Sequence, residues 1–283
     1  MDLYQAILAR RSVRRYHPSP LDKAMLARVD EIVDSVKPLM PENRFRVMRR
    51  DVFTGEDLIA AMGGYGSIIS PPHYLVSYIV GETHPLTDMG FRMQQMAVQM
   101  TQLGLGVCFI GSLGRERGVR VRFRLAPETR TGAFLIFGHP AETLGGRTIN
   151  AVMRHTLGAT SKLPAKSLFF NGSFDEPTAP PRKLAKLIEA ARNAPSANNA
   201  QPWRFLWYDD TLYVFVRRQN LSYGKKAGVE EYRFFDGGIC MSNISMTLET
   251  LEMRGQWVLL YGPEPDIPDY PSTLQPLAKL VLA

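Results

Sequence analysis

The sequence predicts an α+β fold in which one chain holds two homologous halves, each with a central, mainly antiparallel sheet flanked by helices. Two observations predict the halves: a long apolar helix pattern occurs twice, and each copy is followed by a short apolar strand pattern. A third concerns composition, since 45% of the 283 residues are hydrophobic and 22% are charged, which is ordinary globular usage. We therefore expect a folded chain with a substantial core.

The internal repeat begins at Asp88 and again at Asp236. The segments "DMGFRMQQMAVQMTQLGLG" and "DGGICMSNISMTLETLEMRG" share the Asp, a Gly two residues later, a Met five later and a Leu fifteen later. We expect each Asp to lie in the first turn of its helix, where an acid is favourable. Gly106 and Gly255 are expected to end the two helices.

The other expected elements follow from apolar periodicity and turn residues, in chain order. They are a helix at 3–10, strands at 73–81, 107–111 and 132–140, a helix at 181–194, a hairpin at 204–218 with a two-Asp turn, and strands at 256–262 and 277–283. Residues 161–181 are rich in Pro, Ser and Gly and form the seam between the halves. The expected domains are therefore 1–165 and 166–283.

Charge and cysteine usage limit the class of protein. The net charge is +7 with a pI of about 9.5, which permits an anionic ligand without specifying one. Cys108 and Cys240 are too few for a disulfide framework or a zinc site, and a reducing cytoplasm suits them. The sequence shows no signal-peptide pattern and no apolar run long enough to span a bilayer, so we expect a soluble cytoplasmic protein.

Two polar segments interrupt this pattern. The first, "RRSVRR" at 10–15, follows the N-terminal helix and offers guanidinium groups and a hydroxyl that suit a phosphate; taken alone, it is also typical of a solvated basic surface. The second, "PSANNAQPW" at 195–203, follows the helix at 181–194 and, residue by residue, is typical of helix caps and Asx-turns. Together they suggest more than capping.

These segments resemble the two signature motifs of the FMN-dependent nitroreductase family. "ILARRSVRRYHPSPL" and "APSANNAQPWRF" carry the resemblance, and "GLGVCFIGSL" and "FGHPAE" are similar to the family's flavin-facing turn and a later strand. The resemblance implies a nitroreductase-like fold. It also implies an FMN bound at a dimer interface, with the arginine motif from one subunit and the Pro-Ser motif from the other.

The spacing of the motifs departs from the family. Ordinary members carry both motifs about 30 residues apart, whereas nearly 180 residues separate them here. Residues 34–47 of the first half read "DSVKPLMPENRFRV" in place of the Pro-Ser motif, and the second half lacks an arginine motif. The chain thus resembles nitroreductases with two fused halves. We expect a monomer that acts as an internal pseudo-dimer with one FMN site.

The resemblance assigns residues to that site. Arg10, Arg11 and Ser12 would hold the phosphate, Arg14 would lie near the pyrimidine side of the flavin, and the backbone of Ile110 and Gly111 would face its N5 and O4 region. Pro195, Ser196, Ala197 and Asn199 would line the edge of the ring system. Lys162 or, as a rival, Arg147 would add a further contact to the phosphate.

The same resemblance implies the reaction. NADH or NADPH would reduce the flavin, which would then reduce a small-molecule acceptor such as a nitroaromatic or quinone in a ping-pong cycle, with no separate catalytic acid or base required. Arg14 would favour the reduced flavin. An alternative is a flavin-binding storage or sensing protein without turnover. The family does not specify which nicotinamide donor is used.

Other functions have weaker sequence support. The basic segment at 115–124 lacks the aromatic platform of a nucleic-acid binder, so we expect a solvated helix and no nucleic-acid partner. The five histidines lack metal-binding spacing. Gln201 and Trp203 are assigned to structure. Three aromatic residues are candidates either for the pocket wall or for core packing, namely Tyr65, Phe169 and Phe170.

Overall fold

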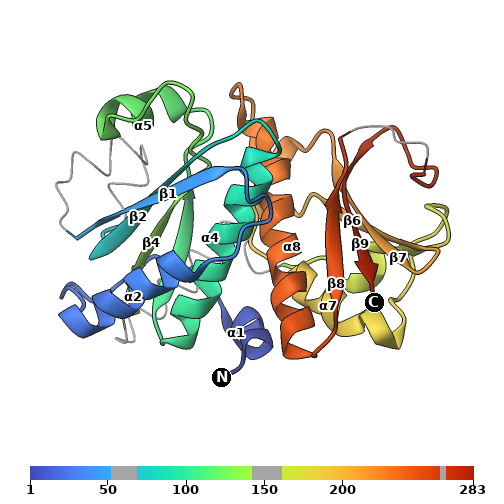
Figure 1. Ribbon diagram of the computed structural model, residues 1–283, viewed down its shortest axis with the longest axis horizontal. Coiled ribbons are helices and arrows are strands. Elements are labelled where there is room, and N and C mark those ends of the chain that lie inside the picture. Colours follow the sequence, from blue (N-terminus) through green and yellow to red (C-terminus); the bar gives the residue numbers. More distant parts are fainter. Residues whose placement is uncertain (52–68, 142–160, 262–265) are drawn as a thin grey trace.

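The computed structural model describes residues 1–51, 69–141, 161–261 and 266–283 (Figure 1). The first half contains α1 (Leu3–Ala9), α2 (Lys23–Ser35), β1 (Arg44–Arg50), β2 (His73–Val80), α4 (Pro85–Gln102), β3 (Gly106–Gly111), α5 (Glu116–Phe123) and β4 (Ala133–Gly138). The second half contains β5 (Phe169–Asn171), α7 (Arg182–Asn193), β6 (Trp203–Tyr208), β7 (Thr211–Arg217), α8 (Tyr232–Thr250), β8 (Gly255–Leu259) and β9 (Leu274–Leu282). Short 3-10 turns are η2 (Ala165–Ser167), η3 (Ala197–Asn199), η4 (Leu221–Tyr223) and η5 (Val229–Glu231).

Each half has its own sheet, and both are mainly antiparallel, as predicted. The first sheet has the order β1-β2-β4-β3, with every neighbouring pair antiparallel. The second has the order β5-β6-β7-β9-β8, and only β5 and β6 run parallel. The predicted hairpin is β6-β7, and its Asp209 and Asp210 both have positive φ, as a tight hairpin turn requires.

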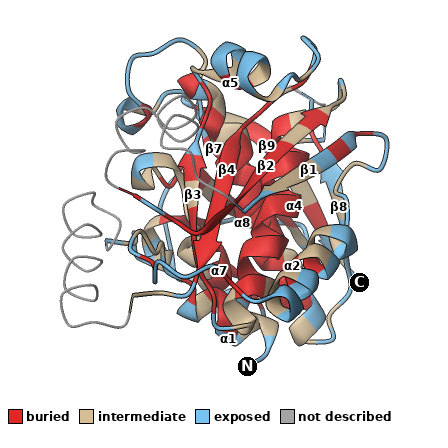
Figure 2. Ribbon diagram, turned by 90° about the vertical axis from the view of Figure 1, so that its left-hand side faces the viewer, coloured by how far each residue is buried: buried red, intermediate tan, exposed pale blue. Residues whose placement is uncertain are grey.

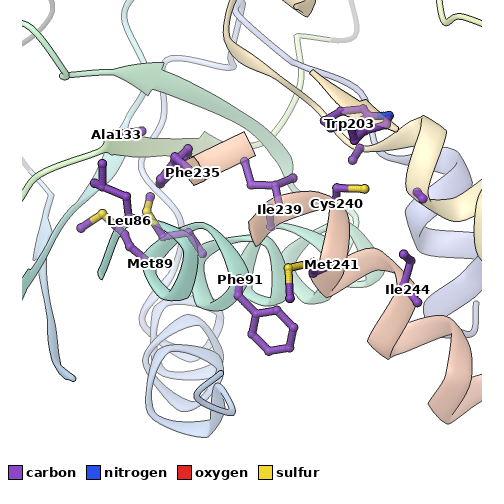
Figure 3. Packing of buried hydrophobic residues seen from close by; sticks show 14 of the residues in the cluster. Leu86, Met89, Phe91, Ala133, Trp203, Phe235, Ile239, Cys240, Met241 and Ile244 are labelled. Atoms are coloured by element: carbon purple, nitrogen blue, oxygen red, sulfur yellow. The ribbon is translucent and has the colours of Figure 1, made fainter. Parts of the chain in front are cut away.

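The long helices α4 and α8 lie side by side between the two sheets (Figures 1 and 3). They approach at two glycines: a Cβ on Gly90 would lie 2.1 Å from the Phe235 carbonyl oxygen, and one on Gly238 would lie 1.9 Å from that of Thr87. Gly90 and Gly238 are the glycines that the sequence repeat shares. The crossing is thus reciprocal, with corresponding residues of each repeat in contact.

Helix α1 packs on both long helices. Its buried Ala6 and Ile7 share a hydrophobic cluster with Val98 of α4, Ala190 of α7 and Met246 of α8. Asp2 caps the helix by accepting the backbone N–H of Gln5 at 2.7 Å. This packing places the arginine motif, which follows α1 directly, beside the boundary of the two halves.

Asp88 lies in the first turn of α4, as predicted, but the other ends of the two long helices differ from the prediction. Helix α8 begins at Tyr232, four residues before Asp236, so the expectation that Asp236 is a first-turn acid is wrong. Gly106 and Gly255 are the first residues of β3 and β8 and do not end the helices. The left-handed residues that follow the helices are Gly104 (φ +79°) and Glu252 (φ +54°).

Two strands do not follow from the predicted pattern. β1 lies at the edge of the first sheet, and four of its seven residues are arginine, so apolar alternation does not mark it. β5 lies within the predicted seam and pairs with β6 through Phe169 and Phe205. The seam therefore contributes an edge strand to the second sheet. Figure 2 shows the sheets and long helices mostly buried and α5 mostly exposed.

Candidate functional site

A cavity of about 560 Å³ lies between the two halves, a size that suits a small-molecule ligand. All eleven residues assigned to the cofactor from sequence line it: Arg10, Arg11, Ser12, Arg14, Ile110, Gly111, Lys162, Pro195, Ser196, Ala197 and Asn199. The two motifs, far apart in sequence, therefore face one space. The rival residue Arg147 lies outside the described residues.

Arg10 is the most deeply buried basic residue of the cavity wall, with 5% of its surface exposed. Within the described ranges, its buried Nε and Nη1 atoms have no hydrogen-bond partner. Burial lowers the pKa of Arg10 to about 10, so the guanidinium stays cationic at neutral pH. A buried cation with unpaired donors requires an anion, and this residue therefore fits a phosphate.

Arg11 and Ser12 extend the same wall. Arg11 is exposed, and its Nη1 donates to the carbonyl oxygens of Leu8 and Arg10 (2.9 Å to the latter) at the end of α1. Ser12 forms a bridge to Val107 of β3, and the N–H of Val13 donates to the Val107 carbonyl at 2.9 Å. The bridge anchors the motif on the edge of the first sheet.

The Pro-Ser segment is held in an unusual backbone conformation. Asn198, Asn199 and Gln201 all have positive φ, a region that asparagine adopts more readily than most residues. Ser196 Oγ accepts the Gln201 N–H at 3.0 Å. The Asn199 amide donates to the Ser161 carbonyl at 2.9 Å. Thus Ser196 and Asn199 line the cavity while their side chains also hold the loop together.

Lys162 also lines the cavity, and its chain neighbours are hydrogen-bonded to Gln201 and Asn199. Its Nζ donates to the Ala194 carbonyl at 2.6 Å and lies 3.5 Å from Asn199 Oδ1. Burial, reinforced by Arg10, lowers the pKa of Lys162 to about 7. Gln201 accepts the Leu163 N–H at 2.9 Å and donates to Ser161 at 3.1 Å, which is the structural role expected for it.

Asp236 lines the cavity, a position that its sequence context did not predict. It is 1% exposed, it accepts the Ala197 N–H at 3.1 Å, and it accepts the Tyr223 hydroxyl at 2.9 Å. Burial raises the pKa of Asp236 to about 7, although both hydrogen bonds and Lys162 oppose the rise. An acid inside the apolar repeat was the available signal. Asp236 thus holds the Pro-Ser loop on α8.

The opposite wall combines the end of β3 with the start of α8. Gly111 lies against Tyr232, because a Cβ on Gly111 would be 2.2 Å from the Tyr232 hydroxyl oxygen. That hydroxyl accepts the Leu113 N–H at 3.0 Å, and burial raises the pKa of Tyr232, which keeps it protonated. Phe109 and Phe235 complete an apolar, aromatic surface, with ring centroids 6.1 Å apart.

The remaining aromatic candidates lie elsewhere. Trp203 is fully buried in the core, as its structural assignment requires. Phe169 is also fully buried, and Phe170 packs on Phe174, so neither lines the cavity. Tyr65 lies outside the described residues. In the part of the chain that the structure covers, no three His, Cys, Asp or Glu residues cluster as a metal site.

A family model described as "Putative TM nitroreductase" matches residues 2–247. The chain belongs to this nitroreductase family. Membership supports an oxidoreductase role. No curated protein matches the sequence.

One solved structure shows the same fold over the whole chain, and others match about half of it. A nitroreductase-like protein of Thermotoga maritima, titled a "putative nitroreductase", is 19% identical, covers 100% of this chain and 94% of its own, and gives a TM-score of 0.59. An FMN-dependent nitroreductase of Clostridium difficile is 16% identical over 49% of this chain and 87% of its own, with a TM-score of 0.41. A protein of Parabacteroides distasonis titled as an NADH dehydrogenase/NAD(P)H nitroreductase is 15% identical over 50% and 88%, with a TM-score of 0.43. Within the described residues, no helix is long and apolar enough to cross a bilayer.

Proposed function

We propose that this nitroreductase-family chain is an FMN-dependent oxidoreductase that transfers electrons from NADH or NADPH to a small electron-poor acceptor, such as a nitroaromatic or a quinone. The observation that carries the proposal is Arg10, a buried cation with unpaired donors on a cavity that both signature motifs line. The two free, buried thiols Cys108 and Cys240 are consistent with a cytoplasmic location.

The cavity fits FMN at the phosphate end. Arg10 and Lys162 are close enough for Arg10 to lower the pKa of Lys162, so two cations converge where Ser12 adds a hydroxyl group. A phosphate there would relieve their repulsion and satisfy the buried donors of Arg10. This explains why basic residues that repel one another are held together.

The rest of the wall suits a flat ring. Phe109, Ile110 and Phe235 supply apolar surface, and β3 is the last strand of its sheet, so its outer edge beyond the Ser12 bridge is not covered by another described strand. FMN would supply the two-electron chemistry, accepting hydride from the nicotinamide and passing it to the acceptor. The role of the protein side chains is to orient the ring and exclude water.

Corresponding residues of the two halves have different side-chain partners, which supports one site per chain. In the first half Asp88 accepts the Leu39 N–H at 2.8 Å, just as Asp236 accepts that of Ala197. Asp88 pairs with Arg92 at 2.8 Å, whereas the residue four positions after Asp236 is Cys240. We infer that Arg92 fills the place of a lost second site.

Flavin stoichiometry tests this proposal. We expect about one FMN per chain after reconstitution with excess FMN, on a monomeric chain, and steady-state NADH or NADPH oxidation with a panel of nitroaromatic and quinone acceptors. Binding of two FMN molecules per chain would refute the single site. Failure to bind any FMN would refute FMN as the cofactor. Bound FMN without turnover would favour the storage or sensing alternative.

A further inference from the structure

We propose that Arg115 and Lys226 form an anion subsite at the end of the cavity away from the arginine motif, and that this subsite selects reactants carrying a carboxylate or phosphate. The inference rests on the proposed function, because it names the class of molecule that reacts at the same site. Neither residue was assigned from sequence, and both line the cavity.

The cavity holds more positive charge than one phosphate needs. Six basic side chains and one acidic side chain line it. One group contains Arg10, Arg11, Arg14 and Lys162. The charges of Arg11 and Arg14 lower the pKa of Arg10, and the charge of Arg10 lowers the pKa of Lys162. Arg115 and Lys226 make up the rest.

The two groups of cations stand at different places along β3. The arginine motif meets this strand at Val107, where Ser12 forms its bridge. Four residues further on, Gly111 marks the end of the strand, roughly 13 Å away at 3.3 Å per residue. Arg115 follows this end and lies near Tyr232. Its positive charge opposes the rise in the pKa of Tyr232 that burial causes. Arg10 and Arg115 are thus carried by backbone segments that meet β3 near its opposite ends.

Contact between the two halves brings Arg115 and Lys226 together. A Cβ on Gly114 would lie 3.2 Å from Val229 Cγ1 and 3.7 Å from Lys226 Cβ. The loop that carries Arg115 therefore packs on the loop that carries Lys226. The subsite, like the cavity as a whole, is built from both halves of the chain.

Two acids near this end, Glu116 and Glu231, are already paired. Glu116 contacts Arg130 at 3.1 Å, and Glu231 contacts the same guanidinium at 2.7 Å. Among the described residues, neither Arg115 nor Lys226 has an ion-pair partner. Both charges thus remain for a ligand that enters the cavity.

The surface between the two groups is aromatic, formed by Phe109, Tyr232 and Phe235. A ligand that uses both the surface and the subsite is a flat ring with an anionic substituent. Two kinds of reactant carry one: a nicotinamide donor with its phosphate and a carboxylated nitroaromatic acceptor.

The test compares charged and neutral reactants of matched shape. Arg115→Gln, Lys226→Gln and the double variant are assayed with 4-nitrobenzoate against 4-nitrobenzamide. As donors, reduced nicotinamide mononucleotide is compared with N-benzyl-1,4-dihydronicotinamide. Arg117→Gln and Lys225→Gln are matched controls, because they remove the same charges from neighbouring residues that do not line the cavity.

We expect the kcat/KM ratio of the charged to the neutral reactant to fall roughly fivefold in each single variant and roughly twentyfold in the double variant. If this ratio falls for the two acceptors, the subsite binds the acceptor. If it falls for the two donors, the subsite binds the donor. The controls should keep the wild-type ratio. An unchanged ratio in the double variant, or an equal fall in the controls, would overturn the proposal.

Calorimetric titration of the oxidised flavoprotein with 4-nitrobenzoate and its amide, and with oxidised nicotinamide mononucleotide, gives a readout without turnover. Weaker binding of 4-nitrobenzoate or of the mononucleotide in the Arg115 and Lys226 variants supports the subsite even where catalysis is absent. A flavin-free wild-type protein would refute the proposed function. Normal flavin content with unchanged affinity for every ligand would refute the subsite alone.

Discussion

Replacing Gly90 with alanine tests the close crossing of α4 and α8. The new Cβ would lie 2.1 Å from the Phe235 carbonyl oxygen, and atoms of this kind do not approach closer than about 3.0 Å. The helices must therefore separate by nearly 1 Å, which forfeits a quarter to a half of the dispersion energy of each contact at the crossing. We expect a loss of about 1–3 kcal/mol in the free energy of unfolding, the usual cost of overpacking.

Gly118 provides a matched control. It lies within α5, and a Cβ there would meet no described atom within 4 Å apart from the backbone of its own helix. Gly118→Ala should therefore raise stability by about 1 kcal/mol, because alanine favours a helix more than glycine does. Urea unfolding of both variants, followed by circular dichroism, measures the two effects. Their opposite signs separate crowding from helix propensity.

The reciprocal substitution sharpens this test. Gly238→Ala meets the Thr87 carbonyl oxygen and should cost about as much as Gly90→Ala. One separation of the helices relieves both contacts, so the double variant should cost less than the sum of the single ones. If Gly90→Ala were as stable as Gly118→Ala, the crossing described here would be wrong.

Three further predictions concern the cavity. Arg10→Gln should weaken FMN binding by about tenfold or more, whereas Arg11→Gln should change it less than about fivefold, because Arg10 is buried with unpaired donors and Arg11 is exposed. Fluorescence titration measures both, and a larger effect of Arg11→Gln would contradict this prediction. Because the pKa of Lys162 is about 7, the free site loses this charge as pH rises above 7. The FMN dissociation constant should then rise by up to about tenfold per pH unit, with a weaker slope in Lys162→Met and the full slope in the exposed control Lys166→Met. The pKa of Asp236 is higher in the folded than in the unfolded chain, so the free energy of unfolding should fall from about pH 4 to pH 7, by on the order of 1 kcal/mol per pH unit. Asp236→Asn should remove that fall. If urea unfolding showed the same pH dependence in the variant as in the wild type, the prediction would be contradicted.

Periodicity and turn residues were sufficient to predict most of the fold. The hairpin at 204–218 was predictable because Asp209 and Asp210 divide two apolar runs. β1 was not predictable, because four of its seven residues are arginine, and Arg49 on the face of Phe45 pairs with Asp30 of α2 where an apolar residue would be expected. The start of α4 was predicted correctly, since Asp88 lies in its first turn, but the start of α8 was misplaced. Asp236 binds the loop at Ala197, a tertiary role that a local pattern does not reveal.

The motif residues of the cavity were predictable from resemblance, but its far end was not. Arg115 and Lys226 are ordinary basic residues in sequence, and only the contact between Gly114 and Val229 brings them to one cavity. The structural use of Asn199 was also hidden, since its partner Ser161 is 38 residues away. Local sequence thus identifies motifs but not the packing between them.

The bridge between Ser12 and Val107, together with the loop at Ala197, affects when the cavity can form during synthesis. The arginine motif faces a loop that emerges from the ribosome nearly 190 residues later. Asp236, which holds that loop, emerges later still. Contacts between such distant residues form slowly. The nascent chain therefore cannot complete its binding site until the start of α8, which carries Asp236, has left the ribosome.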